Sequence, residues 1–196
     1  MDTTEYAIIT IRLQRVNMNL RIKSLPHNEP VTLAFLKAHL RVVDEAEEPY
    51  LTHLLKTARA QIELMCNRVL ITQSWSLELY NPGDFIRLPL APVQKINTIF
   101  LYNSKGDKVS MGLQKIQIEN AQDNPILKVV NPLFGKVKIE FVVGYGDDEN
   151  AVPAPLKHAI LMLAAHFYEH RGDQAAITPE SIKTLVEPYV YRRHCL

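Results

Sequence analysis

The residues whose types and spacing could do chemistry lie near the end of the chain, in His166-Phe167-Tyr168-Glu169-His170. Two histidines four positions apart share one face of a helix, so both imidazoles could bind one metal ion. A glutamate between them could act as general base toward a metal-bound water. The segment has the H-x-x-E-H form of inverted zinc peptidases. One interpretation of residues 166–170 is therefore a zinc-dependent hydrolase with His166, Glu169 and His170 at its centre.

This zinc interpretation lacks a third protein ligand. The chain after His170 offers only a few side chains that bind metals, namely Asp173, Glu180, Glu187, His194 and Cys195. None of them sits in a second helical motif that would position it. A five-residue pattern with three fixed letters also arises readily by chance. We therefore favour the alternative that Glu169, His170 and Arg171 form the polar end of a buried helix, with no catalytic residue and no metal ligand.

The histidines also belong to a longer pattern. His158, Met162, His166 and His170 are each four residues apart and form one ridge of the predicted helix. The ridge could be a subunit or partner contact, or a pH-sensitive seam. It could equally face solvent or strand edges, although Met162 argues for some burial. Together with Tyr145, in the turn before the helix, these residues are the predicted contact site.

The elements that must position the ridge are a strand, a turn and a helix. Residues 136–143 alternate apolar and charged side chains, as a half-buried antiparallel strand requires. Gly144-Tyr145-Gly146 predicts a turn. The helix that follows begins near Pro153 and Pro155, and its apolar residues occupy most of its sides. Such a helix is buried by its own domain or by neighbouring subunits.

The rest of the chain places helices on either side of a β-rich middle. Thr32 predicts the start of a helix to about Arg41, and the acidic run before Pro49 predicts a second helix to Asn67. Period-two patterns and turn signals fill residues 69–144. A short last helix ends at Pro188. The fold class is α+β: a small helical bundle of two N-terminal and two C-terminal helices with a β-rich antiparallel insertion.

The composition excludes several classes of protein. The 196 residues carry a formal net charge of +1, from 22 basic and 21 acidic side chains, so no basic excess marks a dedicated nucleic-acid binder. Two distant cysteines do not describe a disulfide framework and favour a reducing compartment. No apolar run approaches a membrane span, and no dinucleotide or phosphate-loop motif is present. We therefore expect no cofactor and no membrane partner.

Four blocks of sequence, in order, carry a resemblance to a known protein family. The first combines Pro30-Val31-Thr32-Leu33 with residues 37–42 and an acidic stretch before a long helix. The second is Val69 to Trp75, and the third is Ile86-Arg87-Leu88-Pro89-Leu90-Ala91-Pro92-Val93. The fourth runs from Val143-Gly144-Tyr145-Gly146 through residues 152–160 to residues 166–171. Each block alone is weak, whereas four in order are specific. Together they resemble the phage head–tail connector family of tailed phages, prophages and gene transfer agents.

This resemblance implies a structural adaptor, not an enzyme. It implies a ring of identical subunits, often twelve, docked beneath the portal protein of a virion or prophage-derived particle. The ring extends the DNA channel, so DNA only passes through its lumen, and it docks a tail-side stopper or tail-completion protein. The protein would be made in the bacterial cytoplasm and act at the head–tail junction.

The same comparison predicts the domain organisation. Residues 1–30 are an N-terminal extension, and residues 31–196 form a single connector domain. Its helices fall within residues 32–67 and 153–188, and its β-rich insertion within residues 69–144. Besides the zinc hydrolase, a DNA-binding accessory protein remains as an alternative function, which the charge balance disfavours.

Overall fold

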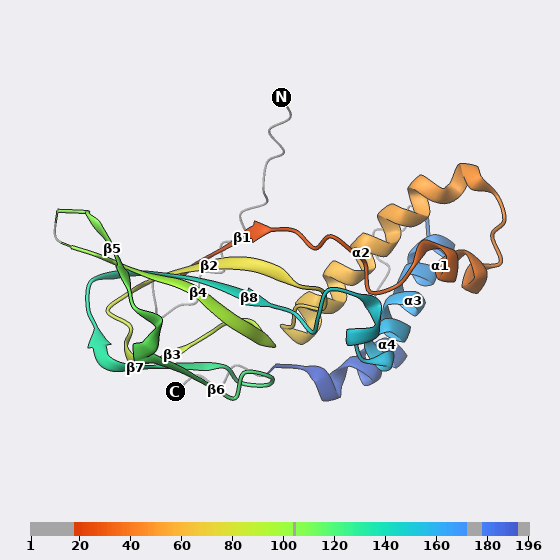
Figure 1. Ribbon diagram of the computed structural model, residues 1–196. Coiled ribbons are helices and arrows are strands. Elements are labelled where there is room, and N and C mark those ends of the chain that lie inside the picture. Colours follow the sequence, from red (N-terminus) through yellow and green to blue (C-terminus); the bar gives the residue numbers. More distant parts are fainter. Residues whose placement is uncertain (1–17, 104, 172–177, 192–196) are drawn as a thin grey trace, which may run out of the picture. The chain divides into compact units, whose positions relative to one another are not determined.

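A computed structural model describes residues 18–103, 105–171 and 178–191, and these divide into two compact units. The β unit comprises residues 18–26 and 72–144, and the helical unit comprises residues 27–71 and 145–191. Each unit therefore takes chain segments from two separate parts of the sequence (Figure 1). The predicted α+β class, with two helices before and two after an antiparallel β region, is confirmed.

The β unit contains two antiparallel sheets, with the three-stranded sheet against one face of the five-stranded sheet (Figure 1). The five-stranded sheet has the order β1 (Asn19–Ser24), β2 (Gln73–Tyr80), β8 (Lys136–Val143), β4 (Val93–Tyr102) and β5 (Lys108–Met111). The three-stranded sheet has the order β3 (Gly83–Arg87), β7 (Ile126–Leu133) and β6 (Ile116–Glu119).

The core of the β unit follows from strand alternation. Val137, Ile139 and Phe141 of β8 are fully buried, and the intervening Lys136, Lys138 and Glu140 are only half-buried. Antiparallel pairing places each buried residue beside another apolar one, for example Leu77 opposite Ile139. Because side chains alternate between the two faces of a strand, one face of the sheet is apolar and the other is charged.

The helical unit contains α1 (Leu33–Leu40), α2 (Glu48–Cys66), α3 (Ala154–Glu169) and α4 (Glu180–Val186), with short 3-10 turns at Glu45–Glu47, Glu149–Ala151 and Glu187–Tyr189. Thr32 begins α1 as predicted, because its Oγ1 accepts a hydrogen bond from the Phe35 N–H at 3.2 Å. Arg41 and Asn67 end α1 and α2 in the left-handed conformation. Among the described residues no helix is long and apolar enough to cross a membrane.

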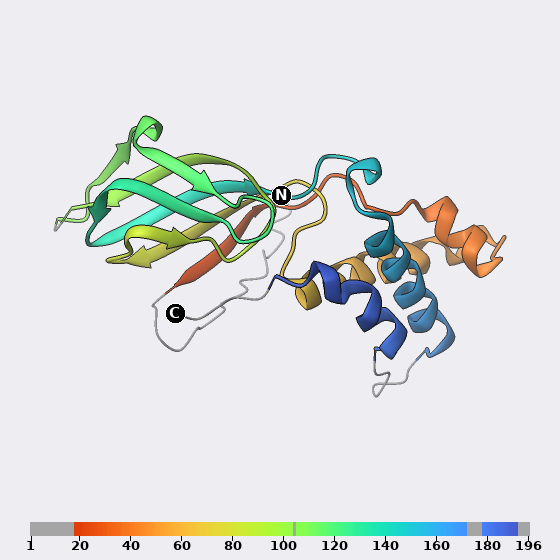
Figure 2. The same ribbon diagram turned by 90° about the horizontal axis from the view of Figure 1, so that it is seen from below.

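The helical core lies where α3 packs against the other helices (Figure 2). The buried residues of α3 spread over roughly 200° of its circumference at 100° per residue: Leu156, Ala159, Ile160, Leu161, Leu163 and Ala164. They meet the buried stripe of α2, which includes Leu51, Leu55, Ala58 and Ile62. The helix that carries most of the predicted contact site therefore also lies at the centre of the helical unit.

The predicted domain organisation stays a prediction. Of the N-terminal extension, residues 1–17 lie outside the described part of the chain. Residues 19–24 form β1, which pairs with β2 at the edge of the five-stranded sheet. The N-terminal part that the structure describes thus supplies a strand to the β unit.

Candidate functional site

The predicted ridge begins on α3 and leaves the helix at its last member. The helix ends at Glu169, and His170 has a φ of −107° and a ψ of 49°, outside the helical region. The backbone N–H of His170 donates to the His166 carbonyl oxygen at 3.1 Å, and its Nδ1 lies 2.8 Å from the same oxygen. Because a carbonyl oxygen only accepts, this Nδ1 carries the proton. The two imidazole rings lie 4.3 Å apart between centroids.

The members of the predicted contact site differ in exposure. His158 and His170 are exposed, whereas Met162 and Tyr145 are half-buried against the helical core. Tyr145 is held by its backbone N–H, which donates to the Leu70 carbonyl oxygen at 3.1 Å. His166 is half-buried, and its Nε2 meets no hydrogen-bond partner in the described part of the chain. The site offers two exposed imidazoles, and its role as a contact stays a prediction.

The zinc interpretation gains no further ligand from the fold. In residues 18–103, 105–171 and 178–191, no three His, Cys, Asp or Glu side chains come together so that they could hold a metal ion. Glu180 and Glu187 belong to this range, and Asp173, His194 and Cys195 lie outside it. The Nδ1 of His170 is engaged by the His166 carbonyl oxygen. Within the described residues, the geometry adds no support for a hydrolase.

Immediately after α3, Arg171 links the end of α3 to the start of α2. Its guanidinium lies 2.5 Å from the Glu47 carboxylate, just before α2. The same group lies over the rings of Tyr168 and Tyr50, at 4.3 and 4.6 Å from their centroids. An arginine that stacks on aromatic rings and pairs with a carboxylate combines a cation–π contact with a charge-assisted hydrogen bond. The predicted polar end of the helix is thus an anchored end.

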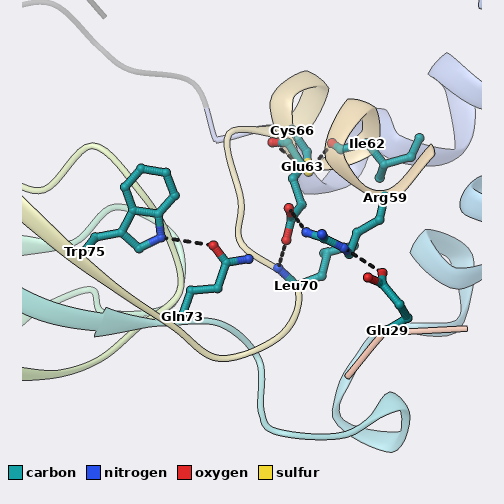
Figure 3. A network of polar contacts seen from close by, with 8 residues as sticks. All are labelled: Glu29, Arg59, Ile62, Glu63, Cys66, Leu70, Gln73 and Trp75. Atoms are coloured by element: carbon teal, nitrogen blue, oxygen red, sulfur yellow. Dashed lines mark hydrogen bonds and ion pairs between the residues drawn. The ribbon is translucent and has the colours of Figure 1, made fainter. Parts of the chain in front are cut away.

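A polar network near the end of α2 was not predicted from the sequence (Figure 3). Arg59 donates from Nε to Glu29 and from a terminal nitrogen to Glu63, both at 2.7 Å, and its side chain is only 11% exposed. The other oxygen of Glu63 accepts from the Leu70 N–H at 2.8 Å. Burial raises the pKa of Glu63 above its ordinary value, against the opposing effect of Arg59. The network fastens three separate segments of the helical unit together.

Cys66 closes the same region of the core. It is buried, and its Sγ lies 2.9 Å from the Ile62 carbonyl oxygen. Burial raises the pKa of the Cys66 thiol to about 11, so the reactive thiolate is scarce near neutral pH. The spacing of Arg59 and Glu63, four residues apart on α2, was the one sequence signal for the neighbouring network.

The charged face of the five-stranded sheet is a second group of polar side chains outside the predicted ridge. We call it the basic sheet face. The register brings together five cations, Arg21, Lys23, Lys108, Lys136 and Lys138, with the aromatic residues Tyr80, Phe100 and Tyr102 and the carboxylates of Glu78 and Glu140. Five cations against two carboxylates leave this face with a net charge of +3.

Ion pairs lie at the middle of the basic sheet face. Lys136 pairs with Glu78 at 3.2 Å, and Lys138 pairs with Glu140 at 3.1 Å. Burial alone would raise the pKa of Glu140, but hydrogen bonds and charges from Lys138 and Lys23 hold it below its ordinary value. Lys108 lies over the Phe100 ring, 3.5 Å from its centroid. Tyr80 is 61% exposed at the end of β2.

Comparison with known proteins decides the family. The family model described as phage gp6-like head-tail connector protein matches residues 30–136, more than half of the chain. The chain belongs to this family of head–tail connectors. Its match begins at Pro30, where the first of the four sequence blocks begins, so the predicted family is confirmed. A search of curated proteins found no match.

Solved structures agree with the assignment of the connector. It is similar to a chain in the neck of an empty gene transfer agent particle with C6 symmetry, with 27% sequence identity and a TM-score of 0.78. A chain from the virion of a native gene transfer agent particle gives the same values. A chain in the neck of the native particle with C12 symmetry gives a TM-score of 0.74 at 27% identity. In each case the alignment covers 90% of the connector and 97% of the other chain.

Proposed function

We propose that the connector assembles as a closed ring of identical subunits beneath the portal at the head–tail junction, in a phage, prophage-derived or gene transfer agent particle. The ring extends the DNA channel and offers a platform to a tail-side stopper or tail-completion protein. The observation that carries the proposal is the match over 90% of the chain to proteins of symmetric particle necks. The number of subunits follows the neck symmetries, with twelve as the expected count.

The structure offers physical support for a scaffolding role. Large apolar side chains remain exposed on both units, among them Val43 at 88%, Phe134 at 74%, Val130 at 73% and Leu64 at 70%. Each of these side chains would leave water if a neighbouring subunit covered it, and burying apolar surface favours association. The described polar groups meanwhile serve structure: Arg59, Glu63 and Arg171 each bind other parts of the helical unit. We infer a structural role without catalysis.

The predicted ridge fits this proposal as a partner contact. His158 and His170 are the exposed members, so they are the ones that a portal or tail-side protein can reach. Met162, His166 and Tyr145 would act by holding the surface beneath them. A His158→Glu/His170→Glu variant should then bind portal more weakly than the parent protein and still form rings.

Electron microscopy of the purified connector, alone and mixed with portal protein, tests the function. We expect rings with a central channel, either in solution or on the portal. A protein that stays monomeric under both conditions and never binds portal or particles would overturn the proposal.

A further inference from the structure

The two units of the connector carry opposite charges. In residues 18–26 and 72–144 the β unit has ten Lys and Arg against six Asp and Glu, a net charge of +4. In residues 27–71, 145–171 and 178–191 the helical unit has eight Lys and Arg against twelve Asp and Glu, a net charge of −4. The near-neutral total of +1 therefore hides two charged halves of equal size.

The positive charge of the β unit concentrates on the basic sheet face, which has a net charge of +3. Ion pairs with Glu78 and Glu140 compensate the lysines of the central strand β8. On the edge strand β1, Lys23 pairs with Glu140 at 3.5 Å. Arg21 on β1 and Lys108 on the other edge strand, β5, are exposed, and neither forms an ion pair with a described carboxylate. An acidic partner would therefore make its most favourable electrostatic contacts at the two edges of this face.

Part of the negative charge of the helical unit lies on exposed carboxylates between α1 and α2. We call it the acidic corner: Asp44 and Glu45 beside Val43, all three exposed. Glu47 and Glu48, which follow, are neutralised by Arg171 and Lys37. Among the described cations none pairs with Asp44 or Glu45, and the Asp44 carboxylate accepts only the Ala46 N–H, at 2.9 Å.

We propose that the basic sheet face receives the acidic corner of a second copy of this chain, an inference that rests on the ring proposed above. Both surfaces combine charge with exposed apolar groups, Tyr80 on the face and Val43 at the corner. Tyrosine is enriched at the centres of protein interfaces, and complementary charge around it sets partner choice and orientation. Because face and corner are different surfaces, the contact is heterologous and can close into a ring.

A DNA duplex suits the basic sheet face less well. The phosphate backbone is recognised by a patch or stripe of cations. Here Glu78 and Glu140 lie in the middle of the face and pair with its central lysines. A docked duplex would bring phosphates against both carboxylates, whereas an acidic protein corner can place its few charges beside the edge cations.

Two charge-reversed variants of the full chain test the contact. The face variant is Arg21→Glu/Lys108→Glu, and the corner variant is Asp44→Asn/Glu45→Lys, in which asparagine keeps the hydrogen bond to Ala46. Like charges across a contact are strongly unfavourable, so each variant alone should associate at least about tenfold more weakly than the parent. Mass photometry and electron microscopy, with and without portal protein, measure assembly.

Mixing the two variants gives the decisive result. The reversed face is complementary to the reversed corner, and the unchanged face of one variant still fits the unchanged corner of the other. An equimolar mixture should therefore form rings in which the variants alternate, although neither assembles alone. The matched control Lys115→Glu/Lys128→Glu changes the charge equally outside the basic sheet face and should assemble normally. Circular dichroism checks that each variant folds.

Each other outcome has a definite meaning. If the parent forms rings and both variants form them equally well, or if mixing does not restore assembly, the face-to-corner contact is wrong and the ring proposal stands. If the parent never assembles, even with portal, the proposed function fails and takes this inference with it. If the face variant assembles normally but loses salt-dependent binding to duplex DNA, the face binds nucleic acid instead.

Discussion

The β unit and the helical unit differ in where their ion pairs lie relative to the apolar core. In the β unit, apolar side chains of the strands fill the core, and the ion pairs lie on the outer face of the five-stranded sheet. In the helical unit an ionic network is largely buried near the end of α2, where Arg59 lies between Glu29 and Glu63. The comparison teaches that charge is a surface property of the first unit and part of the interior of the second.

The largest expected effect comes from the apolar core of the β unit. Phe141 is fully buried on the central strand β8. Phe141→Ala should lower the free energy of unfolding by about 4 kcal/mol, because it leaves a cavity. Chemical denaturation measures the loss, and hydrogen exchange should place it in β2, β4 and β8. Val130→Ala, at a position 73% exposed, is the control and should change little. Equal loss of protection in the helical unit would break the comparison.

The ionic network should be nearly as sensitive. Arg59→Ala leaves the carboxylates of Glu29 and Glu63 without their cation, which should cost about 3 kcal/mol of unfolding free energy. Hydrogen exchange should then increase in α2 and not in the β sheets. Lys183→Ala removes an exposed ion pair with Glu180 and should cost less than about 1 kcal/mol. If both substitutions cost the same, the Arg59 network does not differ from a surface pair.

A third prediction concerns the first turn of chain after the β unit. A Cβ on Gly146 would lie 2.5 Å from the Cβ of Ala151, so one of the two must move. Gly146→Ala should destabilise the helical unit by about 1–3 kcal/mol, as overpacking does. The double variant Gly146→Ala/Ala151→Gly removes the clash and should recover most of the loss. Without such recovery in thermal unfolding, the cause is not this contact.

The smallest expected effect is the pH dependence of stability, which should have opposite signs for one carboxylate in each unit. Burial raises the folded-state pKa of Glu63 above 4.5, so its protonation favours the fold as pH falls through that raised value. The folded-state pKa of Glu140 lies below 4.5 because Lys138 and Lys23 outweigh its burial. Its contribution is therefore present above pH 4.5 and is lost as pH falls through the lowered value.

Unfolding free energies of the parent, Glu63→Gln and Glu140→Gln between neutral and acidic pH check these signs. On acidification the parent should gain stability relative to Glu63→Gln and lose it relative to Glu140→Gln. The same sign for both pairs would mean that the two carboxylates do not experience the different environments described here.

Much of the fold could be predicted because the local patterns and the tertiary contacts agree. The alternation of residues 136–143 became β8 with Val137, Ile139 and Phe141 inside, and Thr32 capped α1 as its residue type predicts. Boundaries were less accurate: the period-two pattern expected from residue 69 becomes a strand only at Gln73. The Leu70 N–H donates to Glu63 and the Leu70 carbonyl oxygen accepts from Tyr145, so this residue belongs to the helical unit.

The candidate site was harder to predict because it depends on which strands lie side by side. Helical spacing found the ridge from His158 to His166, but it could not show that α3 ends before His170. The basic sheet face spans β1, β2, β8, β4 and β5, and only the order of the sheet places these strands, which are distant in sequence, side by side. Likewise, Glu29 reaches Arg59 across 30 residues, a pairing that no local pattern records.

The interleaving of the two units sets an order of events during synthesis. A nascent chain emerges from its N-terminus, and compact units fold as they are completed. Every residue of the β unit has been made once Gly144 is added, whereas the helical unit still lacks α3 and α4. Until α3 has been synthesised, the side chains of Leu51, Leu55 and Ile62 on α2 lack the helix that buries them. We expect the β unit to fold first during synthesis. The helical unit should be the one whose apolar side chains need a chaperone while the chain is still on the ribosome.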